Sequence, residues 1–305
     1  MLPSESFSKT FFPQFTAMTV IELVFPVFSI IALGYLLGRI KSVDIPTLSE
    51  IVVNVTNPCL IFISIARMDI VPSEWLVMGS AAVAIVLGTG VMMWVYQRVS
   101  GVRMRGLFLP AMFMNSGNMG LPFALLAFGQ TGLDKAIIFF ITVSLLHFTL
   151  GVSIAKGDSG FKEIFKLPLI YAALGGLFCS VSGLQLPKPV MIPVEMLSDT
   201  AIPLMLLNLG TQLRSLTVSD IQHAVAGIGI RMGGGLLLAA AFVMFFGITG
   251  TSRNVILLDA IMPPAVFNVI LAQKYNANAD AVASTIFIGT LLSIVTTSLF
   301  LLLVT

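Results

Sequence analysis

The sequence has few charged residues, cysteines or histidines. Only 10% of its 305 residues are Asp, Glu, Lys or Arg, against about 25% in soluble domains. A net charge of +2 leaves no basic stripe for nucleic acid. The two cysteines and two histidines show no metal-ligand spacing and cannot form a disulfide framework. We therefore expect no nucleic-acid partner, no metal centre and no cofactor.

Apolar residues are abundant instead. They make up 57% of the chain, and the mean hydropathy is +1.02. A soluble fold cannot bury that much apolar surface, so the composition predicts an all-α polytopic membrane protein. Ten apolar stretches are long enough to cross a bilayer. They cover about 20–38, 48–66, 75–97, 106–128, 136–154, 167–184, 191–213, 222–246, 254–273 and 281–304.

Lysine and arginine are unevenly distributed between the two sets of connectors. The connectors after the odd-numbered spans carry ten of these residues, and the opposite side carries five. Positive charge favours the cytoplasmic side, so both termini are predicted to be non-cytoplasmic. Residues 1–19 lack the features of a signal peptide and are interpreted as a short tail.

The second half of the sequence repeats features of the first. Leu48–Glu50 recurs as Leu197–Asp199, and the environment of Asp134 recurs at Asp280, at offsets of 149 and 146. Each half has five predicted spans, so the second half enters the membrane with the opposite orientation, as in many secondary transporters. The predicted organisation is a tail (1–19), a first repeat (20–154), a cytoplasmic connector (155–166) and an inverted second repeat (167–305).

Two spans contain helix-breaking residues near their centres. Gly117, Gly120 and Pro122 interrupt the fourth span, and Pro263 and Pro264 interrupt the ninth. Matched breaks in corresponding positions of two halves indicate a central binding site, although two packing kinks are the alternative. Half-helix N-termini at such breaks favour an anionic group such as a carboxylate.

Three motifs resemble the auxin efflux carrier family, which includes plant PIN carriers and bacterial malate and malonate transporters. They are Asn54–Phe62, Asn115–Pro122 and Met262–Pro264, the last followed by Ala272–Asn276. The resemblance extends from about Ile21 to Leu303. It implies ten helices in a five-plus-five inverted repeat, with broken helices 4 and 9 crossing. It also implies a scaffold of helices 1, 2, 6 and 7, an elevator-type transport domain, a homodimer and a location in the bacterial inner membrane.

The resemblance also assigns a role to one residue. Asn115 matches a crossover asparagine that contacts substrate in the plant carriers. The sequence differs from those carriers at Asn268, where they have a second crossover proline, and it lacks their long cytoplasmic loop. The candidate substrate-binding residues are Asn54, Asn57, Asn115, Gly117, Asn118, Gly120, Pro122, Pro263, Pro264 and Asn268.

Ionisable residues within spans are costly and require a role. Arg231 is a candidate counter-charge for an organic anion or for Asp259, with a buried structural pair as the alternative. Asp259 is a candidate proton carrier, and His147 is a candidate relay or a hydrogen-bonded core residue. Glu50 and Asp199 lie toward span ends, where an interfacial or capping role is expected.

The functional prediction is a secondary transporter of elevator type for a small organic acid anion, a mono- or dicarboxylate. One alternative is a sodium-coupled symporter that resembles the bile-acid carriers. Another is an intramembrane enzyme, which would need a catalytic constellation that the spans do not show. The sequence leaves the substrate, the direction of transport and the coupling ion open.

Overall fold

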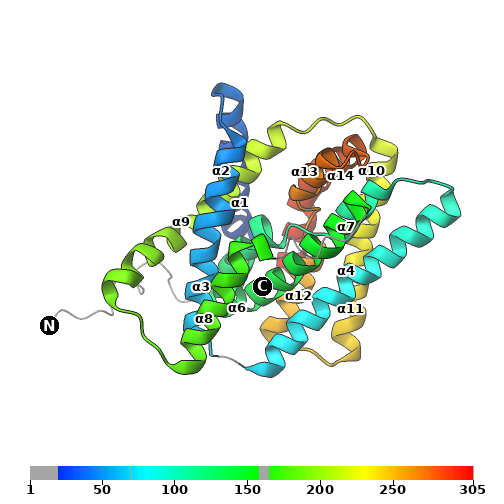
Figure 1. Cartoon of the computed structure of the whole chain (residues 1–305). Helices are drawn as coiled ribbons and strands as arrows, with labels where there is room; N and C mark the ends of the chain where they lie inside the picture. The colour runs from blue at the N-terminus through cyan, green and yellow to red at the C-terminus, as the bar shows by residue number, and fades with distance from the viewer. Residues whose placement is uncertain (1–19, 70, 158–164, 305) are drawn as a thin grey trace.

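The computed structural model describes residues 20–69, 71–157 and 165–304, and this part of the chain is helical, with no strand (Figure 1). The predicted tail at 1–19 and most of the predicted connector lie outside the described residues. The helices in chain order are α1 (Val20–Ile40), α2 (Ile45–Ile51), η1 (Val52–Thr56), α3 (Asn57–Arg67), α4 (Pro72–Ser100), η2 (Arg105–Leu107), α5 (Phe108–Met112), η3 (Ser116–Gly120), α6 (Leu121–Leu146), η4 (His147–Gly151), α7 (Val152–Lys156), α8 (Pro168–Ser182), α9 (Lys188–Arg214), α10 (Ile221–Ile228), η6 (Gly229–Gly234), α11 (Gly235–Phe245), α12 (Gly250–Ile261), α13 (Phe267–Lys274) and α14 (Ala279–Val304).

Seven helical segments in the described ranges are long and apolar enough to cross a membrane. This confirms an all-helical chain with membrane-spanning character, but the ten expected spans do not appear as ten long helices. The fourth and ninth expected spans are broken into short pieces, α5 and η3 in one and α12 and α13 in the other. The sixth is the 15-residue helix α8.

The predicted connector between the fourth and fifth spans is helical in the structure. Ser116–Lys156 forms one 41-residue run, in which Gly129 alone has non-helical angles (φ 64°, ψ −159°). Glycine adopts such positive φ values without the steric cost paid by other residues, so the chain turns there without a loop. Lys135, which falls within this predicted connector, is only 6% exposed.

The helices form two groups, and the groups lie on opposite sides of the molecule in Figure 1. In the first group α1 packs on α9, and α3 packs on α8 and α9. In the second group α4 packs on α6 and α11, α12 packs on α6 and α11, and α10 packs on α14. The interface between α1 and α9 depends on Gly34 and Gly210, because a Cβ atom at either position would overlap the opposite backbone.

Prolines and π-helical turns shape these helices locally. In α2, α4, α8 and α9 a proline occupies the first turn, where its missing N–H costs nothing. In α3 and α6 a proline is the second residue of a helix that directly follows a π-helical segment. Four π-helical segments, η1, η3, η4 and η6, interrupt the longer helices. Each contains a residue that the sequence analysis had selected: Asn54, Asn118, His147 and Arg231 respectively. Such segments occur frequently at functional sites.

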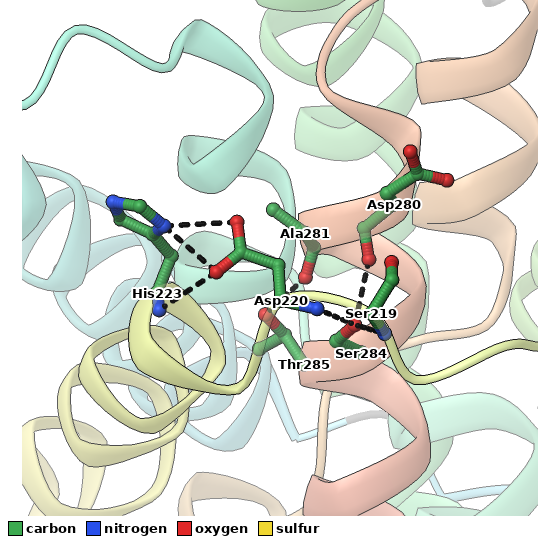
Figure 2. A network of polar contacts seen from close by, with 7 residues as sticks. All are labelled: Ser219, Asp220, His223, Asp280, Ala281, Ser284 and Thr285. Atoms are coloured by element: carbon green, nitrogen blue, oxygen red, sulfur yellow. Dashed lines mark hydrogen bonds and ion pairs between the residues drawn. The ribbon is translucent and has the colours of Figure 1, made fainter.

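A polar network fastens the start of α10 to α14 (Figure 2). Asp220 caps α10 by accepting a hydrogen bond from the His223 amide at 3.2 Å, and its carboxylate lies 2.8 Å from His223 Nδ1. Ser284 Oγ of α14 accepts hydrogen bonds from the amides of Ser219 and Asp220 at 3.0 and 3.1 Å. The chain entering α10 is therefore fixed to the second helix group.

Candidate functional site

The two helix breaks lie against each other. The first lies at 113–115, immediately before Gly117, Gly120 and Pro122, which were predicted to interrupt the span but are helical in the structure. The amide of Asn115 donates a hydrogen bond to the carbonyl oxygen of Pro263 at 2.8 Å, and the amide of Ala265 donates to the carbonyl oxygen of Phe113 at 3.0 Å. Met114 and Pro264 form an antiparallel bridge between these bonds. Backbone groups that the interrupted helices cannot satisfy are thus satisfied by the other break, as buried backbone requires.

Asn115 organises the start of the half-helix that follows the first break. Its side-chain Oδ1 accepts a hydrogen bond from the Asn118 amide at 3.2 Å, which makes it the N-cap of η3. Its carbonyl oxygen accepts hydrogen bonds from the amides of Met119 and Gly120 at 3.3 and 3.0 Å. Pro122 lies in the first turn of α6, as its missing amide favours.

The second break is stabilised by Asn268 as well as by its prolines. Pro263 and Pro264 have no amide hydrogen, so α12 cannot continue through them. Asn268 Nδ2 donates a hydrogen bond to the carbonyl oxygen of Phe113 at 3.0 Å. Asn268 therefore connects the second break to the first.

Arg231 holds the carbonyl ends of both first half-helices. Its guanidinium donates hydrogen bonds to the carbonyl oxygens of Ala111 and Met112 at the end of α5, at 3.3 and 2.8 Å. It also donates to the carbonyl oxygen of Ala260, near the end of α12, at 3.4 Å. Each helix C-terminus carries about half a negative charge. Arg231 is fully buried and compensates the two ends together.

A cavity of about 670 Å³ lies beside the crossing, between the two helix groups. Five of the predicted binding residues line it, and the structure brings them together from three segments: Asn54, Asn57, Asn115, Gly117 and Asn118. His147 also lines it. The remaining predicted residues, Gly120, Pro122, Pro263, Pro264, Asn268, Arg231 and Asp259, are not among its lining residues.

Several polar atoms around the cavity have no hydrogen-bond partner in the described part of the chain. They include Asn57 Oδ1 and Asn115 Nδ2, whereas the side chains of His147 and Asn268 interact with each other. Buried polar groups are normally satisfied, so this cluster indicates that a ligand or water completes it. The described lining residues include Glu50 and His147 but no lysine or arginine. Any anion bound here must therefore be held by amide groups and helix N-termini.

Aromatic rings enclose His147. It stacks on Phe113, with ring centroids 4.2 Å apart and planes 2° apart. Phe267 approaches its edge at a centroid distance of 5.3 Å. The imidazole is 6% exposed and lies between the break residue Phe113 and the start of α13. His147 is therefore a packed residue at the cavity wall.

The sequence analysis predicted Asn54 and Asn57 of the first helix group at this cavity but missed the contribution of Ser49 and of α9. Ser49 Oγ donates a hydrogen bond to Asn208 Oδ1 at 3.1 Å, and Gln212 Nε2 donates to Ser49 Oγ at 2.9 Å. All three line the cavity together with Glu50, for which we had expected an interfacial role. The polar residues of α9, Asn208 and Gln212, were the signal, because they interrupt an otherwise apolar stretch four residues apart.

Comparison with known proteins places the chain in a family. It matches the family described as membrane transport protein over residues 19–164 and again over residues 158–301. A protein of Methanothermobacter thermautotrophicus, named an uncharacterized transporter, is 31% identical over 92% of this chain and 96% of its own length.

Two other relatives carry more specific names. One from Rhizobium meliloti, named "Putative malonate transporter", is 24% identical over 90% of this chain and 92% of its own length. Auxin efflux carrier component 6 of Arabidopsis thaliana is 21% identical over 46% of this chain and 26% of its own length. The resemblance to the auxin efflux carriers is thus confirmed, and the chain belongs to this family of integral membrane transport proteins.

Proposed function

We propose that this protein is a secondary active transporter of small organic acid anions, a mono- or dicarboxylate, bound where the two breaks cross. The observation that carries this proposal is the position of the N-terminal end of η3. It faces the cavity through Ser116, Gly117 and Asn118. The first amides of a helix lack intrahelical partners and carry partial positive charge, so they bind carboxylates.

Asn115 supplies the second element of the anion site. Its Oδ1 is occupied by the Asn118 amide, which leaves Nδ2 as a donor without a partner in the described chain. A carboxylate oxygen accepts from such a donor and from the η3 amides at the same time. Asn54 and Asn57 face this position from η1 and α3, and Asn268 supports the break from behind.

We further propose an inverted repeat and an elevator movement. Residues 20–154 and 167–305 would be the two repeats, each with five spans if the broken helices are counted as single spans. The helix group of α1, α2, α3, α8 and α9 would be the scaffold. The other group would carry the crossing as the transport domain. The location of the cavity between two separately packed helix groups supports this arrangement. A movement of one group relative to the other would change the side of the membrane to which the cavity opens.

The same proposal includes an oligomeric state, a membrane, an orientation and a set of coupling residues. The protein would be a homodimer in the bacterial inner membrane with both termini non-cytoplasmic. Arg231, Asp259 and His147 would be the charged or titratable residues involved in coupling, with Arg231 acting by holding the half-helices.

Uptake by the purified, reconstituted protein tests the function. Liposomes containing the protein would be supplied with radiolabelled acetate, malonate or malate, with and without imposed proton and sodium gradients. We expect saturable uptake of at least one carboxylate, and an excess of the unlabelled acid should compete. Uptake that absolutely requires sodium would favour a symporter of the bile-acid-carrier type. Protein-free liposomes, and liposomes containing Asn115→Asp protein, are the controls. The absence of uptake for every acid would contradict the proposal.

A further inference from the structure

Asp259 is a buried carboxylic acid that the hydrogen-bond network of the crossing does not use. It lies in the last turn of α12 and is 0% exposed. Neither Oδ1 nor Oδ2 has a hydrogen-bond partner within the described chain. An isolated ionised carboxylate in such a position is very costly, so the group requires a proton or a ligand.

The immediate neighbour of this carboxyl group is Gly120. A Cβ atom added at Gly120 would collide with Asp259 Oδ1, so the oxygen occupies the space that the missing side chain leaves. Gly120 is the last residue of η3, and Ser116 is the first. At 1.5 Å per residue the two are about 6 Å apart along the helix. Ser116 lines the cavity and Gly120 does not, so one helical turn separates the cavity from Asp259.

Arg231 is the charged residue that interacts electrostatically with Asp259. The described structure contains no ion pair between them, because the Arg231 guanidinium is directed to the carbonyl oxygens of α5 and α12. Arg231 therefore acts on Asp259 through space and not through a hydrogen bond, so the carboxyl oxygens stay without a donor in the described chain.

The helices packed against α12 carry few other charged groups in the described chain. Glu74 of α4 pairs with Lys135 of α6, and Asp134 accepts a hydrogen bond from Gln130. Arg98, in the last turn of α4, stacks over Trp94. Asp280 lies in the first turn of α14. Arg231 is therefore the counter-charge of Asp259 among the described residues, and the cavity lining holds no lysine or arginine.

We propose that Asp259 carries the proton that accompanies the organic anion, because the two negative groups would lie at the two ends of η3 and repel each other. A carboxylate bound at Ser116 and Gly117 repels an ionised Asp259 across one helical turn in a low-dielectric interior. Substrate and proton therefore bind together and leave together. The proton arrives from water on the substrate-loading side, resides on a carboxyl oxygen of Asp259, and returns to water on the opposite side.

This inference rests on the proposed function and deepens it by naming the coupling ion. Malonate serves as the probe, and its binding to purified protein is measured by calorimetry at a series of pH values. For the wild type we expect the affinity for malonate to fall by up to about tenfold for each unit by which the pH rises. This is the limit for binding that is linked to one proton. Asp259→Asn keeps the shape of the group, removes its charge, and should bind malonate tightly at high pH. Because malonate also binds protons, any pH dependence that comes from the ligand itself should persist in this variant.

The control variant is Asp280→Asn, which removes an acidic residue of α14 outside the crossing and should keep the wild-type pH dependence. In liposomes with a trapped pH-sensitive dye, malonate uptake by the wild type should acidify the interior, and uptake by Asp259→Asn should not. An Asp259→Asn protein that retains the full pH dependence and the acidification would overturn the inference.

Infrared difference spectra separate this inference from the proposed function. The ligand-free wild type should show the carbonyl stretching band of a protonated buried carboxyl group. The intensity of this band should increase when malonate is added. The band should be absent from Asp259→Asn. A wild type that transports malonate without this band disproves the role of Asp259 and leaves the transport function intact. A wild type that has the band but transports none of the acids disproves the transport function and, with it, the coupling.

Discussion

Arg231 Nη1 donates a hydrogen bond to the carbonyl oxygen of Met112 at 2.8 Å, although the two residues are 119 positions apart in the chain. A second nitrogen of the same guanidinium reaches Ala260 on the other interrupted helix. One side chain from η6 thereby fixes the ends of α5 and α12, and the position of the crossing depends on it.

Replacement of Arg231 by Met should destabilise the protein strongly. The change leaves the carbonyl oxygens of Met112 and Ala260 buried without this donor, at about 1–3 kcal/mol for each. The Arg231→Lys variant should be intermediate, because an ammonium lacks the planar fork that serves two helix ends. Thermal unfolding in detergent measures the loss. Arg214→Met, at an exposed position in the last turn of α9, is the control, and equal losses in both would argue against this role.

Asn115→Asp should separate folding from binding. The aspartate retains the oxygen that caps η3 through the Asn118 amide, so we expect a melting temperature close to that of the wild type. It replaces the unpartnered Nδ2 donor with a negative oxygen, which should reduce carboxylate binding by at least about tenfold, equivalent to about 1.4 kcal/mol. Calorimetric binding and thermal unfolding are measured on the same preparation. Unchanged binding would remove Asn115 from the anion site.

Gly210→Ala should disrupt the packing of α1 against α9. The added methyl group would overlap the backbone at Ile31 and Tyr35, and such overpacking typically costs about 1–3 kcal/mol. Gly233→Ala is the matched control, because an added Cβ there meets no atom within 4 Å. The control should be neutral or slightly stabilised, since alanine favours helix. A loss in Gly233→Ala as large as that in Gly210→Ala would contradict this explanation.

Lys135 and Glu74 should show an interaction in a double-mutant cycle. Their side chains form an ion pair between α6 and α4, with 7% and 40% of their surfaces exposed. Glu74→Gln leaves a buried ammonium without its partner, and we expect a loss below the about 3–5 kcal/mol typical of fully buried pairs. Lys135→Met combined with Glu74→Gln should lose less than the sum of the single variants. Simple additivity in thermal unfolding would show that the pair contributes nothing.

The sequence by itself determined the class of protein and the location of both helix breaks. Its apolar composition excludes a soluble fold, and Pro263 and Pro264 lack the amide hydrogens that would continue α12. The polar, glycine-rich stretch of the fourth span indicated the first break to within a few residues: the break lies at 113–115, and Gly117 and Pro122 are helical. These are local or averaged properties, so they can be predicted without knowing which segments approach each other. The family resemblance rested on the same motifs and was confirmed.

Tertiary structure alone decided how the site is assembled. The pairing of Asn115 with Pro263, the destination of Arg231 and the contribution of Gln212 to the cavity all join residues far apart in sequence. Lys135 lies in the segment expected between the fourth and fifth spans, yet it is buried and pairs with Glu74 of α4. A lone side chain does not specify its partner. Hydrogen bonds and ion pairs depend on which helices pack together and on how far each helix is shifted along its axis relative to the other.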